Sequence, residues 1–348
     1  MTYSYNDISI VPAEISNIKS RSECYPFIGK YSIEKIPQKL PLFTAPMSTV
    51  VNMENRELFE NNHINTIIPR NIPIDIRYDN ILKGNWVALS LKEFKEYFID
   101  DTRIKINPDI VYQICIDIAN GHMKSLYEDV GLVKKNYGSN IRIMVGNIAN
   151  PETYRHCVTA GVWGVRVSIG SGAGCITSTN TGIHYPIASL IEEIYGIKQE
   201  YLNDYNHWYP GLELPKIIAD GGVRNYSDII KALALGADYV MVGSLFAQLK
   251  ESAADTVDVD GKGTYRKLFY GMASREGQIC LNGKKTRAAE GISKTLPIIG
   301  TIESWVDNMI EYLQSAMSYC DCEYLERFRP SKVKTVVISN NTQNSINK

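Results

Sequence analysis

Residues 141–167, IRIMVGNIANPETYRHCVTAGVWGVRV, contain one complete unit of strand, helix and strand. The apolar runs Ile141–Val145 and Gly164–Val167 are typical of strands that are covered on both faces, as in a parallel sheet. Between them, Pro151–Ala160 is expected to form a helix that begins with proline in its first turn and ends at Gly161. Two such strands joined by a helix indicate an α/β fold.

The same alternation continues on both sides of this unit. Further strands are expected at Leu42–Ala45, Thr66–Ile68, Trp86–Leu89, Ile114–Ile118, Lys216–Ala219 and Tyr239–Val242. Further helices are expected at Met123–Tyr137, Ile187–Tyr195 and Ser227–Leu235, the last of which is followed by Gly236. Eight strands that alternate with helices predict a closed (β/α)8 TIM barrel rather than an open sheet.

Segments beyond the eighth strand are expected to lie outside the barrel. A short hairpin is expected around Asp260-Gly261, and Ile302–Met317 has the pattern of a final amphipathic helix. Residues 331–348 are polar and are expected to form a flexible tail, in which Val333–Ser339 could add a short strand. We therefore expect residues 1–330 to form a single catalytic barrel domain.

The composition excludes several classes of protein. The 348 residues are 44% hydrophobic and 22% charged, and a formal net charge of -1 favours neither nucleic acid nor an anionic membrane as a partner. No apolar run approaches the roughly 18 residues of a membrane span, and Met1–Pro12 lacks the features of a signal peptide. The seven scattered cysteines argue against a disulfide framework, so a cytoplasmic protein is expected.

A glycine-rich loop follows the sixth strand, with the sequence GSGAGCIT at residues 170–177. Three glycines in five residues allow positive φ angles and close approach of the backbone, which can hold an ion. Active sites of barrels lie on the loops after the strands, and a thiolate on such a loop is a candidate nucleophile. Cys175 is therefore a candidate catalytic residue, and the alternative is a tight turn around an inert cysteine.

The two following strands end in motifs that suit a nucleotide. Asp220-Gly221-Gly222 places a carboxylate, an acceptor for a ribose diol, before two glycines, and Gly243-Ser244 closes the eighth strand. Barrels frequently bind phosphate at the loops after strands seven and eight. We interpret the two motifs together as a phosphate site, with ordinary turn glycines as the alternative.

Three further motifs lie at expected strand ends or loops. Residues 269–274, FYGMAS, could line a base pocket, and residues 287–291, RAAEG, present a cation and a carboxylate. A carboxylate near Thr177 could move a proton through its hydroxyl, whereas a solvated charge pair is the alternative. Residues 117–122, DIANGH, place a carboxylate and an amide after the fourth strand, where an ordinary N-cap would look the same.

Taken together and in this order, the motifs resemble the IMP dehydrogenase and GMP reductase family. The resemblance extends from residues 5–8, YNDI, and 20–22, SRS, through Ala45-Pro46-Met47 to the final helix. It implies that Cys175 adds to C2 of a purine. It also implies a monovalent cation, usually potassium, on the backbone carbonyls of Gly170, Gly172 and Cys175.

The resemblance implies further roles by position. Substrate contacts are implied at Met47, Asp220, Gly222, Gly243, Ser244, Gly271, Met272, Ala273, Ser274 and Arg287. Cofactor contacts at the nicotinamide are implied at Asp117, Ala119, Asn120 and Gly121. The family is usually tetrameric, so a homotetramer is expected.

Three features resemble the GMP reductase branch of the family. Residues 117–121, DIANG, match its D-x-A-N-G pattern, and RAAEG matches its R-A-S-E-G, whose glutamate here is Glu290. The segment between Met272 and Gly291 is short and lacks the Arg-Tyr pair with which the dehydrogenase activates water, and there is no regulatory insert. The branch implies NADPH-dependent conversion of GMP to IMP and ammonia, through a covalent thioimidate on Cys175, with Thr177 and Glu290 supplying the proton.

Three residues depart from the family pattern. Ala173 replaces a serine that helps to hold phosphate, Gly174 replaces an aliphatic residue, and Ser48 replaces an aspartate. A deoxynucleotide or a modified purine nucleotide therefore stays open as the substrate. An NAD-dependent IMP dehydrogenase that forms XMP also stays open, as does a purine-nucleotide-binding regulator without turnover.

Overall fold

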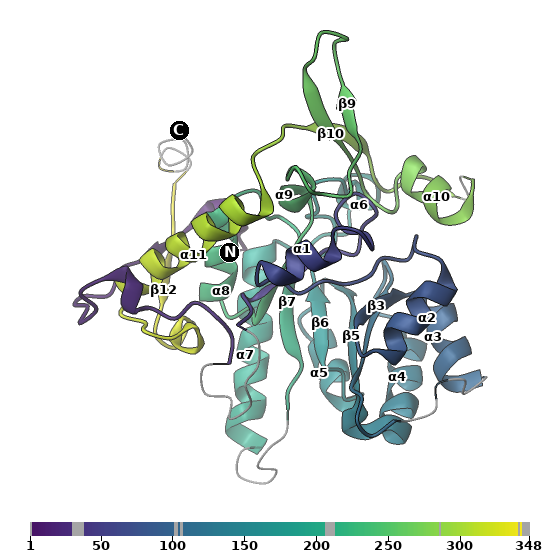
Figure 1. The fold of residues 1–348 in the computed structure, drawn as a ribbon. Coiled ribbons are helices and arrows are strands. Elements are labelled where there is room, and N and C mark those ends of the chain that lie inside the picture. Colours follow the sequence, from purple (N-terminus) through teal and green to yellow (C-terminus); the bar gives the residue numbers. More distant parts are fainter. Residues whose placement is uncertain are drawn as a thin grey trace.

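The chain folds into an α/β barrel. A computed structural model describes residues 2–29, 38–100, 104, 107–205, 213–284, 287–339 and 342. Its main sheet is parallel, with the strand order β2-β8-β7-β6-β5-β4-β3, and it curls into a barrel with helices outside (Figure 1). The strands are β2 (Leu42–Thr44), β3 (Trp86–Leu89), β4 (Tyr112–Asp117), β5 (Ile141–Ile148), β6 (Gly164–Val167), β7 (Lys216–Asp220) and β8 (Tyr239–Val242). The predicted (β/α)8 fold is confirmed.

The predicted strand Thr66–Ile68 does not form a regular strand. Isolated bridges join Asn65 to β2 and Ile68 to β3, so this segment closes the ring between the two ends of the sheet. Between the bridges, the N–H of Ile67 donates to the Thr44 hydroxyl at 3.1 Å rather than to a backbone carbonyl. A hydrogen bond to a side chain thus replaces one backbone hydrogen bond between the strands, which is why the prediction of a regular strand was wrong.

Alternate strand positions fill the inside of the barrel. The buried inward side chains include Phe43, Ile67, Trp86, Ala88, Cys115, Met144, Trp163, Ile218 and Met241. The rings of Trp86 and Trp163 pack with centroids 4.8 Å apart. Because side chains alternate along a strand, the next inward positions toward the carboxyl ends of β4, β6 and β7 are Asp117, Arg166 and Asp220. The apolar barrel core therefore ends in a layer of charged residues.

Helices surround the barrel, and the four that the sequence predicts are present as α4 (Lys124–Tyr137), α5 (Thr153–Thr159), α7 (Ile187–Tyr205) and α8 (Tyr226–Ala234). Three further helices, α1 (Arg56–Asn61), α2 (Ile74–Leu82) and α3 (Leu91–Lys95), were not predicted. The expected stops Gly161 and Gly236 have φ angles of +70° and +107°, which favour glycine. Helix α7 extends beyond its predicted end because Ile197 and Tyr201 continue its packed face. Within the described residues, no helix is long and apolar enough to cross a membrane.

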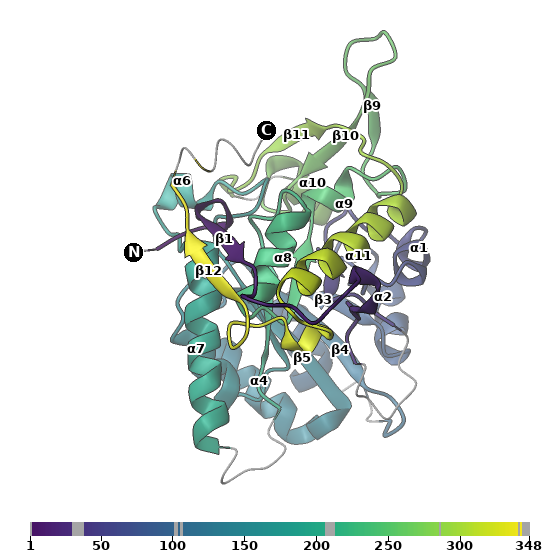
Figure 2. The ribbon, with the colours of Figure 1, turned by 90° about the vertical axis from the view of Figure 1, so that its left-hand side faces the viewer.

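Smaller elements cover the carboxyl end of the barrel and one side of it. The hairpin of β9 (Thr256–Asp258) and β10 (Tyr265–Tyr270) confirms the predicted hairpin and projects above the barrel (Figure 1). At the same end lie α6 (Thr177–Thr181), α9 (Ser244–Ala247), α10 (Arg275–Asn282) and β11 (Ser293–Leu296) (Figures 1 and 2). Short helical turns occur at η1 (Tyr5–Asp7), η2 (Arg21–Glu23), η3 (Glu96–Asp100), η4 (Gly138–Asn140) and η5 (Leu325–Arg327).

The first and last parts of the described chain meet on the side of the barrel. Strand β1 (Ile8–Val11) pairs antiparallel with β12 (Lys334–Val337), beside the long helix α11 (Ile302–Tyr319) (Figure 2). The expected final helix is confirmed, as is a short strand within Val333–Ser339.

Candidate active site

A cavity of about 250 Å³ opens at the carboxyl end of the barrel, where the loops after the strands converge. Most of the predicted site residues line it, although they come from segments far apart in the sequence. These residues are Met47, Asp117, Ala119, Gly170, Gly172, Cys175, Thr177, Asp220, Gly222, Gly243, Ser244, Gly271, Met272, Ala273 and Glu290. The fold thus gathers the glycine-rich loop, both strand-end motifs and Glu290 around one space.

A chain of three polar side chains lies on one wall of this cavity. The Cys175 thiol donates to the Thr177 hydroxyl at 3.3 Å, and that hydroxyl donates to the Glu290 carboxylate at 2.8 Å. Hydrogen bonds in series provide a path for a proton between the sulfur and the carboxylate. This arrangement links a candidate nucleophile to a candidate acid and base through one hydroxyl.

Backbone pairing brings Glu290 to the glycine-rich loop. The N–H of Ile176 donates to the Glu290 carbonyl at 2.9 Å, and the N–H of Ile292 donates to the Gly174 carbonyl at 2.9 Å. These two bonds form a short antiparallel bridge between the loop and the segment after α10. The position of the carboxylate is therefore fixed by main-chain geometry as well as by its contact with Thr177.

Gly174 allows the loop to lie directly on β10. A Cβ atom at this position would come within 3.1 Å of the Phe269 ring and 3.2 Å of the Gly271 nitrogen. Such contacts are closer than most side chains tolerate, so Phe269 or Gly271 would have to shift by a few tenths of an ångström to admit a larger residue. The departure from the family pattern at this position has a packing reason in this chain.

The other cysteines do not resemble Cys175 in their surroundings. Cys175 is half-buried in the cavity wall, whereas Cys280 is exposed on α10 and the remaining five are buried. Burial raises the pKa of Cys115 to about 12 and that of Cys157 to about 12. A thiol with such a pKa stays protonated and unreactive at neutral pH. Cys175 is therefore the cysteine placed to react with a ligand of the cavity.

Arg166 forms the charged floor of the cavity, and its importance was not recognised from the sequence. Its guanidinium, which is nearly buried, contacts the Asp117 carboxylate at 2.7 Å and that of Asp220 at 2.9 Å. The Asn147 amide also donates to Asp220, at 2.8 Å. All these contacts with Asp220 use its Oδ2 atom. An arginine in the otherwise apolar strand Gly164–Val167 was the signal that could have revealed this network.

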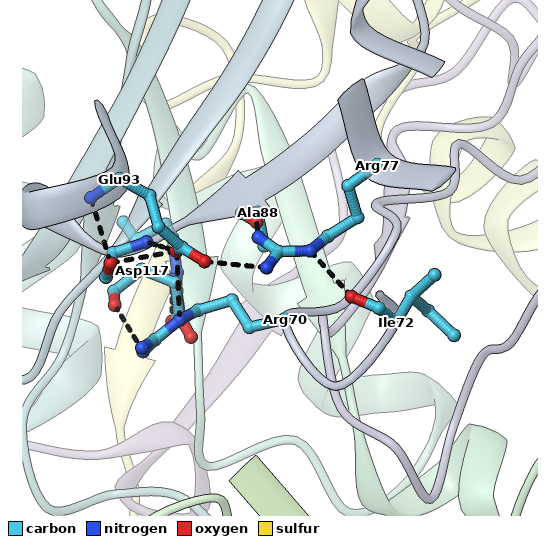
Figure 3. A network of polar contacts seen from close by, with 8 residues as sticks. Arg70, Ile72, Arg77, Ala88, Glu93 and Asp117 are labelled. Atoms are coloured by element: carbon cyan, nitrogen blue, oxygen red, sulfur yellow. Dashed lines mark hydrogen bonds and ion pairs between the residues drawn. The ribbon is translucent and has the colours of Figure 1, made fainter. Parts of the chain in front are cut away.

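A second network extends from this floor toward β3 (Figure 3). Arg70 donates to the Asp117 carbonyl at 3.4 Å and lies 3.9 Å from the Glu93 carboxylate. Glu93 also accepts a hydrogen bond of 2.6 Å from the buried Arg77. Arg77 in turn donates to the Ala88 carbonyl at 3.0 Å. Two arginines thus tie the end of β3 to the end of β4 through one carboxylate.

Glu93 should make stability depend on pH in the acid range. Burial alone would raise the pKa of Glu93, but hydrogen bonds from Arg77 and Ser90 lower it below its ordinary value of 4.5. The folded chain then binds fewer protons than the unfolded chain, so this stabilisation is present above pH 4.5 and is lost as the pH falls through the folded pKa. At neutral pH, Glu93→Gln should lower the free energy of unfolding by about 1.5–3 kcal/mol.

Urea unfolding of both proteins at a series of pH values measures this effect. The difference between wild type and Glu93→Gln should shrink as the pH falls below 4.5. Glu96→Gln, on the adjoining π-helical turn η3 and outside this network, is the control. A difference that stays constant through the acid range would show that Glu93 does not stabilise the fold by its charge.

The carbonyls of the glycine-rich loop are compatible with a monovalent cation. Gly170 has a φ of +82°, and its carbonyl accepts a hydrogen bond from Ser178 at 3.3 Å. The Gly172 carbonyl accepts from the Cys175 N–H at 2.9 Å. Each carbonyl oxygen has a second lone pair, which could bind a cation. No group of three His, Cys, Asp or Glu side chains in the described ranges could hold a metal ion, so backbone oxygens are the ligands that this loop offers.

Four predicted site residues lie outside the cavity lining. Asn120 accepts the N–H of His122 at 3.0 Å, and the N–H of Gly121 donates to the Asn147 carbonyl at 2.8 Å. Both residues therefore shape the turn after β4, next to Asp117 and Ala119 in the cavity wall.

The other two belong to the cap around α10. Ser274 is fully buried and accepts the N–H of Gly277 at 3.0 Å as the N-cap of the helix. Arg287 is exposed, and its backbone N–H donates to the side-chain oxygen of Gln278 at 3.0 Å. Ser274 thus acts through the local structure of the cap, and direct contact of either residue with a substrate stays a prediction.

Comparison with known proteins agrees with this geometry. The profile of a family described as "IMP dehydrogenase / GMP reductase domain" matches residues 101–347. The chain is 32% identical to a GMP reductase of Staphylococcus carnosus over 352 residues, which cover 98% of each chain. It is 30% identical to a GMP reductase of Oceanobacillus iheyensis, over 98% of this chain and 97% of the relative. It is also 30% identical to a GMP reductase of Onchocerca volvulus, over 92% of this chain and 87% of the relative.

Proposed function

The chain belongs to the IMP dehydrogenase/GMP reductase family, and from this premise we propose that it is a GMP reductase that uses Cys175 as its nucleophile. The observation that carries the proposal is the hydrogen-bonded series of Cys175, Thr177 and Glu290 in the cavity wall. A reductase needs a group that protonates the departing amine, and a protein that only binds nucleotides needs neither a nucleophile nor an acid. The overall reaction converts GMP, a reduced nicotinamide and two protons into IMP, an oxidised nicotinamide and ammonium.

Nucleotide binding follows from the layer of polar groups at the barrel mouth. The Oδ1 atom of Asp220 accepts a ribose hydroxyl, because Arg166 and Asn147 hold the carboxylate by Oδ2. The phosphate lies on the loops of Gly222, Gly243 and Ser244, as barrel enzymes commonly arrange it. The purine base contacts the remaining cavity residues Met47, Gly271, Met272 and Ala273.

The first chemical step forms the covalent adduct. Thr177 takes the proton of the Cys175 thiol as it passes its own proton to Glu290, which leaves a thiolate and a neutral carboxyl group. The thiolate forms a bond to C2, and the electron pair of the C2–N3 double bond moves to N3. When that double bond reforms, the C2–amine bond breaks, and the Glu290 proton returns through Thr177 to the amine nitrogen. Ammonia leaves, and a thioimidate on Cys175 remains.

The second step returns the purine. When bound beside Asp117, Ala119, Asn120 and Gly121, the reduced nicotinamide supplies the hydride that C2 requires. Reformation of the C2–N3 double bond then expels the Cys175 thiolate, which takes a proton from water. The small Ala119 side chain leaves room for a flat ring at this wall, and the contact with Arg166 keeps Asp117 in place.

The proposal includes the remaining inferences drawn from the resemblance. NADPH is the hydride donor, and potassium binds the carbonyls of Gly170, Gly172 and Cys175. The enzyme is a cytoplasmic homotetramer. An IMP dehydrogenase is the second candidate, but the short segment between Met272 and Gly291 gives it no water-activating Arg-Tyr pair.

Absorbance of the reduced nicotinamide tests the proposed function. With purified protein and potassium, we expect loss of this absorbance with GMP and NADPH, together with release of ammonia. An increase with IMP and NAD would identify a dehydrogenase instead. The absorbance could stay unchanged with both pairs but fall with dGMP or with a modified purine nucleotide. That result would identify the nucleotide that is turned over as the substrate in place of GMP.

A further inference from the structure

Asn147 lies at a bulge near the carboxyl end of β5. Gly146 pairs with Arg166 of β6, and the next pair of the ladder joins Ile148 to Val167. Asn147 is therefore an extra residue between the two pairs, and a bulge beside an active site commonly redirects a side chain. Asn147 also lines the active-site cavity, although the mechanism described above takes no proton or electron from it.

The main chain of Asn147 holds the turn after β4, where the contacts proposed for the nicotinamide lie. Its N–H donates to the Ile118 carbonyl at 3.0 Å, and its carbonyl accepts the N–H of Gly121 at 2.8 Å. A Cβ atom added at Gly121 would come within 2.7 Å of the Asn147 carbonyl oxygen, which leaves no room for a side chain there. The turn and Asn147 are therefore packed closely together.

The side chain of Asn147 holds the carboxylate that is proposed to bind the ribose. Its Nδ2 atom donates to Oδ2 of Asp220 at 2.8 Å. One residue thus contacts the turn after β4 through its main chain and the ribose carboxylate through its side chain. Arg166 makes a second connection between the same two places, because its guanidinium lies 2.9 Å from the Asp220 carboxylate and 2.7 Å from that of Asp117.

Burial makes the connection through Arg166 stiff. The Arg166 side chain is 8% exposed, and those of Asp117 and Asp220 are 19% and 16% exposed. Charge-assisted hydrogen bonds are strong in such surroundings, and moving one partner alone would leave a nearly buried charge unpaired. Because the two carboxylates share one guanidinium, a shift of Asp220 changes how Arg166 contacts Asp117. The position of the ribose carboxylate therefore affects the wall at which the nicotinamide is proposed to bind.

From these contacts, and on the basis of the proposed function, we infer that Asn147 and Arg166 are positioning residues that couple the two ligand sites, so that a nucleotide on Asp220 raises the affinity for the nicotinamide cofactor. A ribose hydroxyl that binds Asp220 fixes this carboxylate, and both connections then order the turn after β4 before the second ligand arrives. The loss of conformational entropy occurs once for the two ligands, which gives positive cooperativity. Linkage requires the same factor in both directions.

Calorimetric titrations of the full chain with IMP and NADPH test this inference. This pair cannot react, because C2 of IMP already carries the hydrogen that the cofactor would deliver. We expect saturating IMP to raise the affinity for NADPH by at least about 5-fold, the lower end of the usual coupling between two sites. Saturating NADPH should raise the affinity for IMP by the same factor.

Two variants remove the connections one at a time. Asn147→Ala loses the amide that contacts Asp220 but keeps the main-chain bonds to the turn. Arg166→Lys keeps the charge but lacks the planar fork that reaches both carboxylates. In each variant we expect both ligands to bind alone, while the coupling factor falls toward one.

Ribose 5-phosphate separates this coupling from direct contact between the base and the nicotinamide, because it has no base. It should still raise the affinity of the wild type for NADPH, but not that of the two variants. Asn150→Ala is the control, because Asn150 is an exposed asparagine in the segment after β5 and lies outside the cavity lining. This variant should keep the wild-type factor with both probes.

The inference is overturned if the wild-type factor with IMP is below about 5-fold, if ribose 5-phosphate has no effect, or if both variants keep the control's factor. A wild type that binds neither ligand would overturn the proposed function together with the inference. Coupled binding without any reduction of GMP would instead overturn the proposed function alone.

Discussion

Replacing Cys175 by alanine is expected to abolish turnover of GMP, with a fall of at least about 10⁴-fold, the order found when the nucleophile of a covalent mechanism is removed. Nucleotide binding should survive, because the contacts proposed for the ribose, phosphate and base come from other residues of the cavity. A quenched single turnover, analysed by mass spectrometry, should show the adduct on wild type and none on the variant.

Cys280→Ala is the matched control for this experiment. Cys280 is also a free cysteine, but it is exposed on α10 and does not line the cavity. This variant should keep the wild-type rate and the adduct. Persistent turnover in Cys175→Ala, or an adduct that maps to Cys280, would rule out the proposed nucleophile.

Glu290→Gln is expected to lower turnover by about 10²–10⁴-fold, the usual contribution of a general acid or base. Glutamine can still accept a hydrogen bond from Thr177, so the loop geometry and the GMP affinity should be retained. What the variant loses is the ability to take the thiol proton and return it to the amine. Steady-state kinetics should therefore show a lower kcat with little change in the binding constant for GMP.

Thr177→Val tests whether the hydroxyl is part of the same proton path. If Thr177 and Glu290 act as one unit, the double variant should be little slower than the worse single variant, since their effects are not additive. Glu276→Gln is the control, because Glu276 is an exposed carboxylate on α10 that lies outside the cavity lining. Fully additive losses, or near-normal turnover in Glu290→Gln, would contradict the relay.

The sequence predicted the barrel because its strands are short apolar runs separated by helices of regular spacing. The prediction was wrong at Thr66–Ile68, where the Thr44 hydroxyl takes the place of a backbone carbonyl. The hydrophobic periodicity indicates which faces of a strand are buried. It does not indicate where a side-chain hydroxyl replaces a backbone carbonyl as the hydrogen-bond acceptor between two strands. The end of α7 was missed for a related reason, because the tertiary packing of Ile197 extends the helix.

The candidate site was predicted only where residues form a local motif. Cys175, Asp220 and Gly243 could be found this way, since Cys175 lies in the loop after β6, Asp220 is the last residue of β7 and Gly243 directly follows β8. The contact of Thr177 with Glu290 spans 113 positions, so the residues alone could not place the two side chains together. Only the resemblance to the family gave that pairing.

The floor of the site depends on contacts that no linear pattern contains. Arg166 meets Asp117 and Asp220 because three different strands point inward at the same height in the barrel. That coincidence follows from the register of the sheet, which composition and hydrophobic periodicity do not determine. The second arginine network, around Glu93, was missed for the same reason.

The small sheet of β1 and β12 supports the proposed nucleotide site from a distance. Strand β1 follows immediately after η1, whose Tyr5 ring packs beside Gly222, where an added Cβ atom would lie 3.5 Å from it. The carbonyl of Asp7 in the same turn accepts the N–H of Ile338, at 2.8 Å, next to β12. Residues near position 338 therefore help to hold η1 in place, so that a substitution there should weaken binding at the proposed phosphate site without contacting the phosphate itself.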